Sequence, residues 1–133
     1  MASPRILIVD DEEVFAKNTT KLLSHRGYNA FYVTNADTAI LALEKTDFDV
    51  VILDLRLPGM DGLSIFKEIV KLKFTTKVLI LAIHGYVDDA LEAIKLGAYD
   101  YLLKPCGIEE LTEKIEDACK APPLYPVSVP AWP

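Results

Sequence analysis

Residues 5–11, Arg-Ile-Leu-Ile-Val-Asp-Asp, join a short apolar run to two adjacent carboxylates, Asp10 and Asp11. A run this short and this rich in isoleucine and valine is typical of a parallel strand that is buried on both faces. In an open α/β sheet, ligands bind outside the carboxyl ends of the strands. The segment therefore predicts a buried strand with a candidate ligand site directly behind it.

The same arrangement recurs twice further along the chain. Residues 50–53, Val-Val-Ile-Leu, are followed by Asp54, and residues 101–103, Tyr-Leu-Leu, are followed by Lys104. Because the carboxyl ends of parallel strands meet at one edge of a sheet, we expect these two side chains to converge with the acidic pair. An anionic pocket with one cation suits a divalent metal ion held beside a carboxylate that can be modified.

Five segments with strand character alternate with five helical segments. Alternation with short connections predicts a parallel sheet that is covered on both faces, and five such units suit the flavodoxin-like strand order 2-1-3-4-5. Strands are expected at residues 5–9, 29–33, 50–53, 77–83 and 99–103, and helices near residues 13–25, 36–43, 63–71, 87–94 and 108–118.

Local signals mark several helix ends. Thr34 to Asp37 resembles a capping box, which would start the second helix. Asp61 and Gly62 are expected to start the third helix, and Gly97 lies where a glycine typically ends a helix.

Length and composition limit the possible functions. The 133 residues suit one domain, and the net charge of −6 argues against a large nucleic-acid surface. Cys106 and Cys119 lack the spacing of a zinc site or disulfide framework. No signal peptide or membrane-spanning run is evident, so we expect a soluble, cytoplasmic protein.

Three motifs together resemble the receiver domain of two-component response regulators, most closely the receivers of transcriptional regulators. They are ILIVDDE at residues 6–12, DLRLPGMDG at residues 54–62 and YLLKP at residues 101–105. The resemblance implies a receiver domain over residues 4–120, followed over residues 121–133 by a proline-rich tail or linker remnant.

The resemblance also implies a phosphoryl-accepting site that uses Mg²⁺. Asp54 would be the phosphoacceptor, and Lys104 would contact the phosphoryl group. Asp11 and Asp54 would ligate Mg²⁺ directly, Asp10 would act through a water, and the backbone carbonyl of Arg56 would complete the protein ligands. Mg²⁺ prefers oxygen ligands in octahedral geometry. Since phosphoryl transfer depends mainly on positioning and electrostatics, no enzyme activity beyond self-phosphorylation and autodephosphorylation is expected.

One stretch departs from the family pattern. Receivers usually place serine or threonine at the end of the fourth strand, followed by a small residue, whereas this chain has Ala82 and Ile83. Tyr101 matches the aromatic residue that responds to phosphorylation in the family. A hydrogen bond to a charged group contributes ~1.5–3 kcal/mol, comparable to a coupling energy of ~1–3 kcal/mol between sites. We therefore expect a weakened conformational response.

Three functional hypotheses follow. The first is a receiver phosphorylated by a sensor histidine kinase, and the second is a phosphorylation-independent interaction domain, which Ala82 favours. The third is a hydrolase with an aspartyl-phosphate intermediate, which typically needs an acid where Arg56 stands. By family analogy, a homodimer or effector-domain contact would use the fourth helix, fifth strand and fifth helix, at residues such as Leu91, Ala98 and Asp100.

Overall fold

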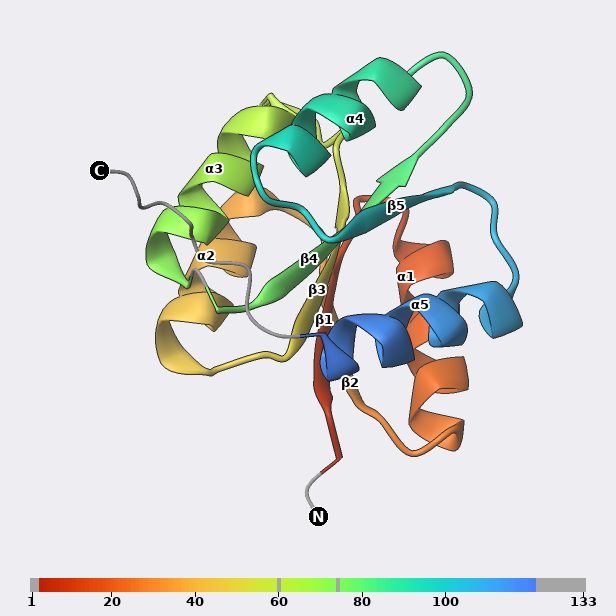
Figure 1. Ribbon diagram of the computed structural model, residues 1–133. Coiled ribbons are helices and arrows are strands. Elements are labelled where there is room, and N and C mark those ends of the chain that lie inside the picture. The colour runs from red at the N-terminus through yellow and green to blue at the C-terminus, as the bar shows by residue number, and fades with distance from the viewer. Residues whose placement is uncertain (1–2, 60, 74, 122–133) are drawn as a thin grey trace.

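The computed structural model describes residues 3–59, 61–73 and 75–121 and shows a parallel sheet between two layers of helices (Figure 1). The strand order is β2-β1-β3-β4-β5, which confirms the flavodoxin-like arrangement. The predicted tail lies outside the described residues from position 122 onward. The strands are β1 (Arg5–Val9), β2 (Asn29–Val33), β3 (Val50–Asp54), β4 (Lys77–Ala82) and β5 (Asp100–Leu103). The helices are α1 (Glu13–His25), α2 (Ala36–Lys45), α3 (Gly62–Leu72), α4 (Val87–Lys95) and α5 (Ile108–Lys120).

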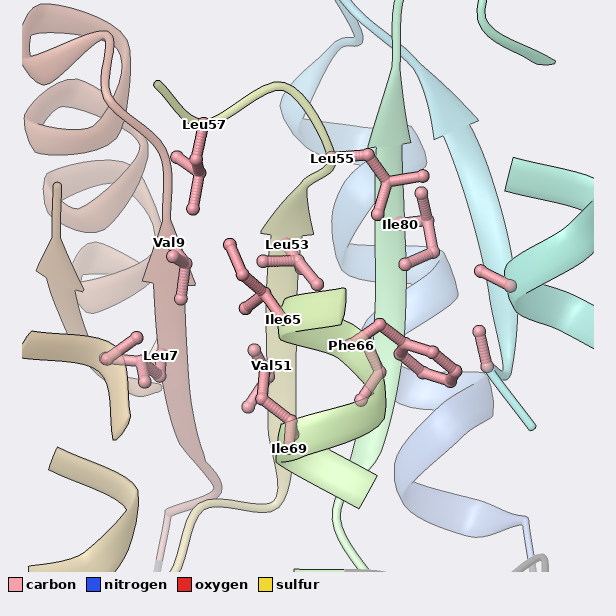
Figure 2. Packing of buried hydrophobic residues seen from close by; sticks show 14 of the residues in the cluster. Leu7, Val9, Val51, Leu53, Leu55, Leu57, Ile65, Phe66, Ile69 and Ile80 are labelled. Carbon is pink, nitrogen blue, oxygen red and sulfur yellow. The ribbon is translucent and has the colours of Figure 1, made fainter. Parts of the chain in front are cut away.

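The sheet is buried on both faces. Alternate residues of each central strand point to opposite sides, and both sets are apolar and packed against helices. In β3, Val51 and Leu53 pack in the cluster that includes side chains of α2, α3 and α4, whereas Val50 and Ile52 pack in the cluster that includes α1 and α5. Figure 2 shows the first face, where Phe66 and its neighbours on α3 lie against the strands. Complete burial of one such aliphatic side chain contributes roughly 1.5–3 kcal/mol.

The start of α3 lies unusually close to the chain that leaves β3. A Cβ atom added at Gly62 would be 2.0 Å from the carbonyl oxygen of Leu55. Only glycine permits this approach, so residue 62 determines how closely α3 can follow the loop that begins after Asp54.

Two helix ends can be compared with the sequence predictions. The capping-box prediction was wrong by one residue: Asn35 is the N-cap of α2, and its side chain accepts a hydrogen bond from the Thr38 amide at 2.9 Å. An asparagine oxygen satisfies this otherwise unpaired amide directly. The prediction for Gly97 is confirmed, because it follows the C-cap of α4 with a φ of +120°, a conformation that glycine adopts without strain.

A buried lysine connects the first residue of β4 to the end of α5. The Nζ atom of Lys77 donates hydrogen bonds to the carbonyl oxygens of Ala118 at 3.0 Å and Ala121 at 2.7 Å. Ala118 lies in the last turn of α5, where its carbonyl oxygen also accepts from the Ala121 amide at 3.3 Å, and Ala121 is the C-cap. The ammonium group therefore holds the helix end against the sheet. In the described part of the chain, no helix is long and apolar enough to cross a bilayer.

Candidate functional site: an acidic pocket at the carboxyl edge of the sheet

The strand order brings the predicted acids together. β1 and β3 are neighbours, with Val9 opposite Leu53, so the residues that follow, Asp10 and Asp54, lie side by side. Asp10 is fully buried and Asp54 is 7% exposed, whereas Asp11 is exposed. The three residues each offer a carboxylate oxygen, and these oxygens lie within 4.8 Å of one another. The convergence expected from the strand ends is therefore present.

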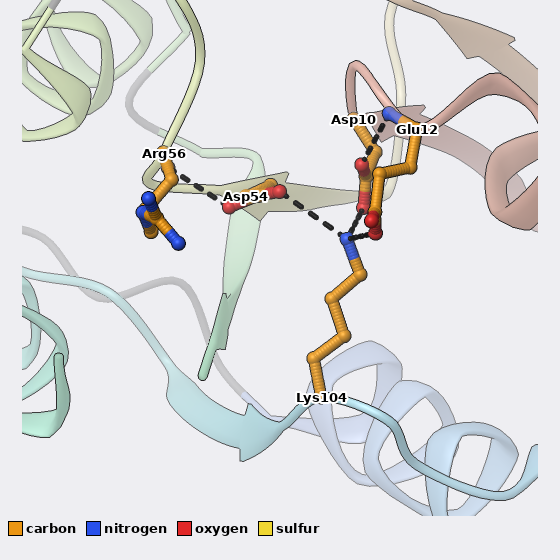
Figure 3. Close-up of polar contacts among 5 residues, drawn as sticks. All are labelled: Asp10, Glu12, Asp54, Arg56 and Lys104. Atoms are coloured by element: carbon orange, nitrogen blue, oxygen red, sulfur yellow. Dashed lines mark hydrogen bonds and ion pairs between the residues drawn. The ribbon is translucent and has the colours of Figure 1, made fainter. Parts of the chain in front are cut away.

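Lys104 reaches this acidic group from the far side of β4. Its backbone amide donates a hydrogen bond to the carbonyl oxygen of Ala82 at 2.8 Å, which places the residue beside the end of β4. From there its Nζ atom lies 2.8 Å from Oδ2 of Asp10 and 3.3 Å from Oδ2 of Asp54, as Figure 3 shows. The ammonium group thus bridges the buried acid and the predicted phosphoacceptor.

Backbone amides hold the other oxygen of each acid. The Glu12 amide donates to Oδ1 of Asp10 at 2.9 Å, and the Arg56 amide donates to Oδ1 of Asp54 at 2.8 Å. Each carboxylate therefore has one oxygen fixed by the loop that follows its strand and the other paired with Lys104. Such charge-assisted hydrogen bonds fix the orientation of the two carboxylates.

The electrostatics of the pocket reflect burial and charge pairing. Burial raises the pKa of Asp10 and the Asp54 charge adds to this effect, although hydrogen bonds from Lys104 and the Glu12 amide oppose it. Burial alone would lower the pKa of Lys104, but its hydrogen bonds to Asp10 and Glu12 and the nearby carboxylate charges raise it above its ordinary value. Lys104 is therefore a permanent cation in this pocket at neutral pH.

Two neighbours of Lys104 were given no role from the sequence. Glu12 forms a further ion pair with the ammonium group, and the ring centroid of Phe15 lies 4.7 Å from Nζ. The position of Glu12 directly after the acidic pair was the one available signal, and the structure places this residue at the N-cap of α1. The aromatic contact depends on how α1 packs, which no local pattern encodes.

The donor set fits a magnesium ion. Three carboxylates from two adjacent strand ends supply the hard oxygen ligands that Mg²⁺ prefers, and the exposed Asp11 leaves one side open to water or a phosphate group. Without a cation, clustered carboxylates repel one another, and Lys104 offsets only part of their charge.

The β4–α4 side of the pocket has a different character. Ala82 is buried at the end of β4 and carries no hydroxyl group, and Ile83 and Tyr101 are half-buried. Tyr101 packs against the cluster that contains Ala82. His84 lies exposed in the following loop.

A sequence model of the response regulator receiver domain matches residues 6–116. The chain belongs to this family. Receiver domains are signalling modules of two-component response regulators, and they bind Mg²⁺ at an acidic pocket of the kind that Asp10, Asp11 and Asp54 form here.

Several relatives are much longer than this receiver. It is 37% identical over 121 residues to the putative response regulator NtrX-like of Rickettsia bellii and 33% identical over 114 residues to the regulatory protein AtoC of Escherichia coli. These matches cover 90% and 86% of this chain but only 25% of each relative. The receiver thus spans about a quarter of the length of these relatives.

Solved structures agree with this assignment. The receiver domain of NtrX from Brucella abortus matches with a TM-score of 0.83 and 33% identity, covering 87% of this chain and 98% of that one. A CheY-like receiver domain from Methanospirillum hungatei matches with a TM-score of 0.83 and 26% identity, covering 88% of this chain and 94% of that one. The five-stranded arrangement is therefore that of a CheY-like receiver.

The residues predicted for a partner face occupy different environments. Leu91 on α4 is 46% exposed, whereas Ala98 is buried in the core and is not available to a partner. Asp100 is half-buried and forms an ion pair with Lys114 of α5. Of these three, only Leu91 presents an exposed apolar side chain.

Proposed function

We propose that Asp54 accepts a phosphoryl group from a sensor histidine kinase in the cytoplasm. The observation that carries this proposal is the placement of its carboxylate: one oxygen is held by the Arg56 amide, and the other lies 3.3 Å from the Lys104 ammonium group. Asp10, by contrast, is fully buried, and the ion pairs of Lys104 with described residues are to Asp10, Glu12 and Asp54, not to Asp11. Asp54 therefore combines a fixed orientation with a neighbouring cation.

Asp10, Asp11 and Asp54 would hold Mg²⁺, with the backbone carbonyl of Arg56 as a further ligand and Asp10 acting through a water. When bound, the ion neutralises negative charge on the phosphoryl oxygens. A carboxylate oxygen of Asp54 attacks phosphorus and forms a new O–P bond, while the bond from phosphorus to the nitrogen of the donor histidine breaks and its electron pair stays on that nitrogen. Lys104 is positioned to stabilise the negative charge of the transferring group.

The test is incubation with acetyl phosphate and Mg²⁺, followed by intact-mass measurement. We expect the wild-type chain to gain the mass of one phosphoryl group and Asp54→Asn to gain none. Asp61→Asn is the matched control, because Asp61 is a carboxylate at the N-cap of α3 and should leave the mass gain intact. An undiminished gain in Asp54→Asn would refute the assignment.

One observation favours a second candidate, an interaction domain that works without phosphorylation. Ala82 lacks the hydroxyl group that the family uses to link the phosphoryl group to the β4–α4 loop. A ligand shifts a conformational equilibrium only through contacts that differ between the two states. If the wild-type chain gains no phosphoryl mass under any condition that phosphorylates a control receiver, this second candidate replaces the first.

The longer relatives suggest how the receiver would act. AtoC is named as a regulatory protein, so we propose that this receiver controls an effector domain or protein. The face for homodimer or effector contacts would comprise α4, β5 and α5. In this proposal, the receiver unit comprises residues 4–120.

A further inference from the structure

A cation on the rim of the pocket is held by an aromatic ring on the opposite loop. The guanidinium carbon of Arg56, in the loop between β3 and α3, lies 4.6 Å from the centroid of the Tyr86 ring, at the N-cap of α4. Both residues are exposed, so the stacking is an open, weak cation–π contact. The Arg56–Tyr86 contact therefore joins two loops across the rim without fixing them strongly.

The root of the Arg56 side chain is fixed next to Asp54. The Arg56 amide donates to Oδ1 of Asp54 at 2.8 Å, and the close approach of Gly62 to Leu55 shapes the loop that carries it. Figure 3 shows the Arg56 side chain emerging beside the Asp54 carboxylate. The guanidinium group can change direction by side-chain rotation alone, while its backbone stays in place.

Arg56 is also the uncommitted cation of the pocket. Lys104 pairs with Asp10, Glu12 and Asp54, whereas within the described part of the chain Arg56 forms no ion pair. A phosphoryl group adds negative charge and acceptor oxygens, and arginine binds such groups through two parallel hydrogen bonds. The neutral ring of Tyr86 should therefore bind the Arg56 guanidinium group more weakly than a phosphoryl group on Asp54 would.

Tyr86 connects this competition to the start of α4. Its amide donates to the carbonyl oxygen of Ile83 at 3.0 Å and its carbonyl accepts from the Ala90 amide at 3.4 Å. Tyr86 therefore belongs to both the loop after β4 and the first turn of α4. A change in the contacts of the Tyr86 ring can therefore act on this loop. Ala82 has no hydroxyl group that could draw the same loop toward the pocket.

We propose that the Arg56 guanidinium group reads the phosphorylation state of Asp54. It lies on the Tyr86 ring when Asp54 is unmodified, and it binds the phosphoryl oxygens and leaves Tyr86 when Asp54 is phosphorylated. This inference rests on the proposed function, because it requires a phosphoryl group on Asp54.

The experiment follows the side-chain Nε–H signal of Arg56 by NMR before and after treatment with acetyl phosphate and Mg²⁺. The chain has three arginines, Arg5, Arg26 and Arg56, so the spectrum is simple, and Arg56→Lys assigns the signal. The ring current of Tyr86 should hold this signal upfield in the unmodified chain, and phosphorylation should move it downfield. Arg5 and Arg26 serve as internal controls and should not move.

A variant tests the role of the ring. Tyr86→Leu keeps apolar bulk but removes the aromatic face, so it should move the Arg56 signal downfield without phosphorylation. It should also reduce the phosphorylation-dependent shifts of amides 83–88 by about twofold or more, because part of the difference between states is already present. Phe31→Leu, at an exposed aromatic residue of β2, should leave both signals as in wild type.

Intact mass on the same samples separates the two proposals. If the mass shows phosphorylation but the Arg56 signal stays in place, or Tyr86→Leu changes neither readout, the inference is wrong and the phosphoacceptor assignment stands. If the wild-type mass does not change, both are wrong.

Discussion

The two sides of the pocket differ in how firmly their charged groups are held. On the β1–β3 side, Asp10 is fully buried, and both it and Asp54 contact Lys104. On the β4–α4 side, the exposed ring of Tyr86 contacts Arg56 of the β3–α3 loop, and the Ala82 side chain offers no polar group. The first side is built from strand ends and the second from loops. The charged groups of the first side are therefore firmly held in this receiver, whereas the second side depends on weak contacts.

A substitution on the β1–β3 side of the pocket should have the largest effect on stability. Lys104→Met leaves the buried Asp10 without its ammonium partner, and we expect a loss of about 3 kcal/mol in the free energy of unfolding, measured in urea without Mg²⁺. Lys95→Met, at an exposed lysine of α4, is the control and should change stability by less than about 0.5 kcal/mol.

The pH dependence of Lys104→Met provides an independent check. Burial raises the folded-state pKa of Asp10, so the folded state binds a proton more readily than the unfolded chain. Lys104 opposes this rise, so its removal should raise the pKa of Asp10 further. Lowering the pH should therefore protonate Asp10 in the variant first and reduce the difference in unfolding free energy between variant and wild type. A deficit that is independent of pH, or smaller than about 1 kcal/mol, would contradict the buried ion pair.

A smaller loss is expected at the glycine behind Asp54. Gly62→Ala would place a Cβ atom 2.0 Å from the Leu55 carbonyl oxygen and force the loop away from α3, at a cost of about 2 kcal/mol by thermal or urea unfolding. Gly107→Ser is the control, since a Cβ atom there meets nothing within 4 Å. Equal stabilities of the two variants would show that the loop is not held as closely as described.

Mg²⁺ bound by Asp10, Asp11 and Asp54 should stabilise the folded state by mass action. At ten times its dissociation constant, Mg²⁺ adds about 1.4 kcal/mol and raises the melting temperature. Asp11→Asn should reduce the gain, whereas Asp37→Asn, which removes the same charge from the first turn of α2, should not. A flat melting temperature in wild type would argue against a metal site.

Substitutions on the β4–α4 side should have the smallest effects on stability and should change mainly the response to phosphorylation. Ala82→Thr restores the hydroxyl group and should enlarge the phosphorylation-dependent amide shifts around His84 and Tyr101, whereas Ala82→Val, which has the same shape without the hydroxyl, should not. Ile83→Ala should speed loss of the phosphoryl group by opening the path of the attacking water. Indistinguishable responses of Thr and Val at position 82 would remove the hydroxyl argument.

The contrast between strand ends and loops also explains what the sequence predicted. The strand order and the meeting of Asp10, Asp54 and Lys104 followed from apolar runs and the residues directly behind them. The stacking of Arg56 on Tyr86 could not be predicted, because it depends on how two loops meet in space. The shift of the α2 cap from Thr34 to Asn35 shows a milder limit, since both residues are good caps and the local pattern alone does not distinguish them.

The hydrogen bonds from Lys77 to Ala118 and Ala121 have a mechanical consequence. β4 begins at this lysine and ends at Ala82, so one extended strand about 20 Å long links the pocket rim to the opposite edge of the sheet. Lys77 holds the last turn of α5 at the start of that strand. Fraying of this turn would therefore break both hydrogen bonds of the buried ammonium group. The sheet therefore fixes the position of Ala121, the last residue that the structure describes.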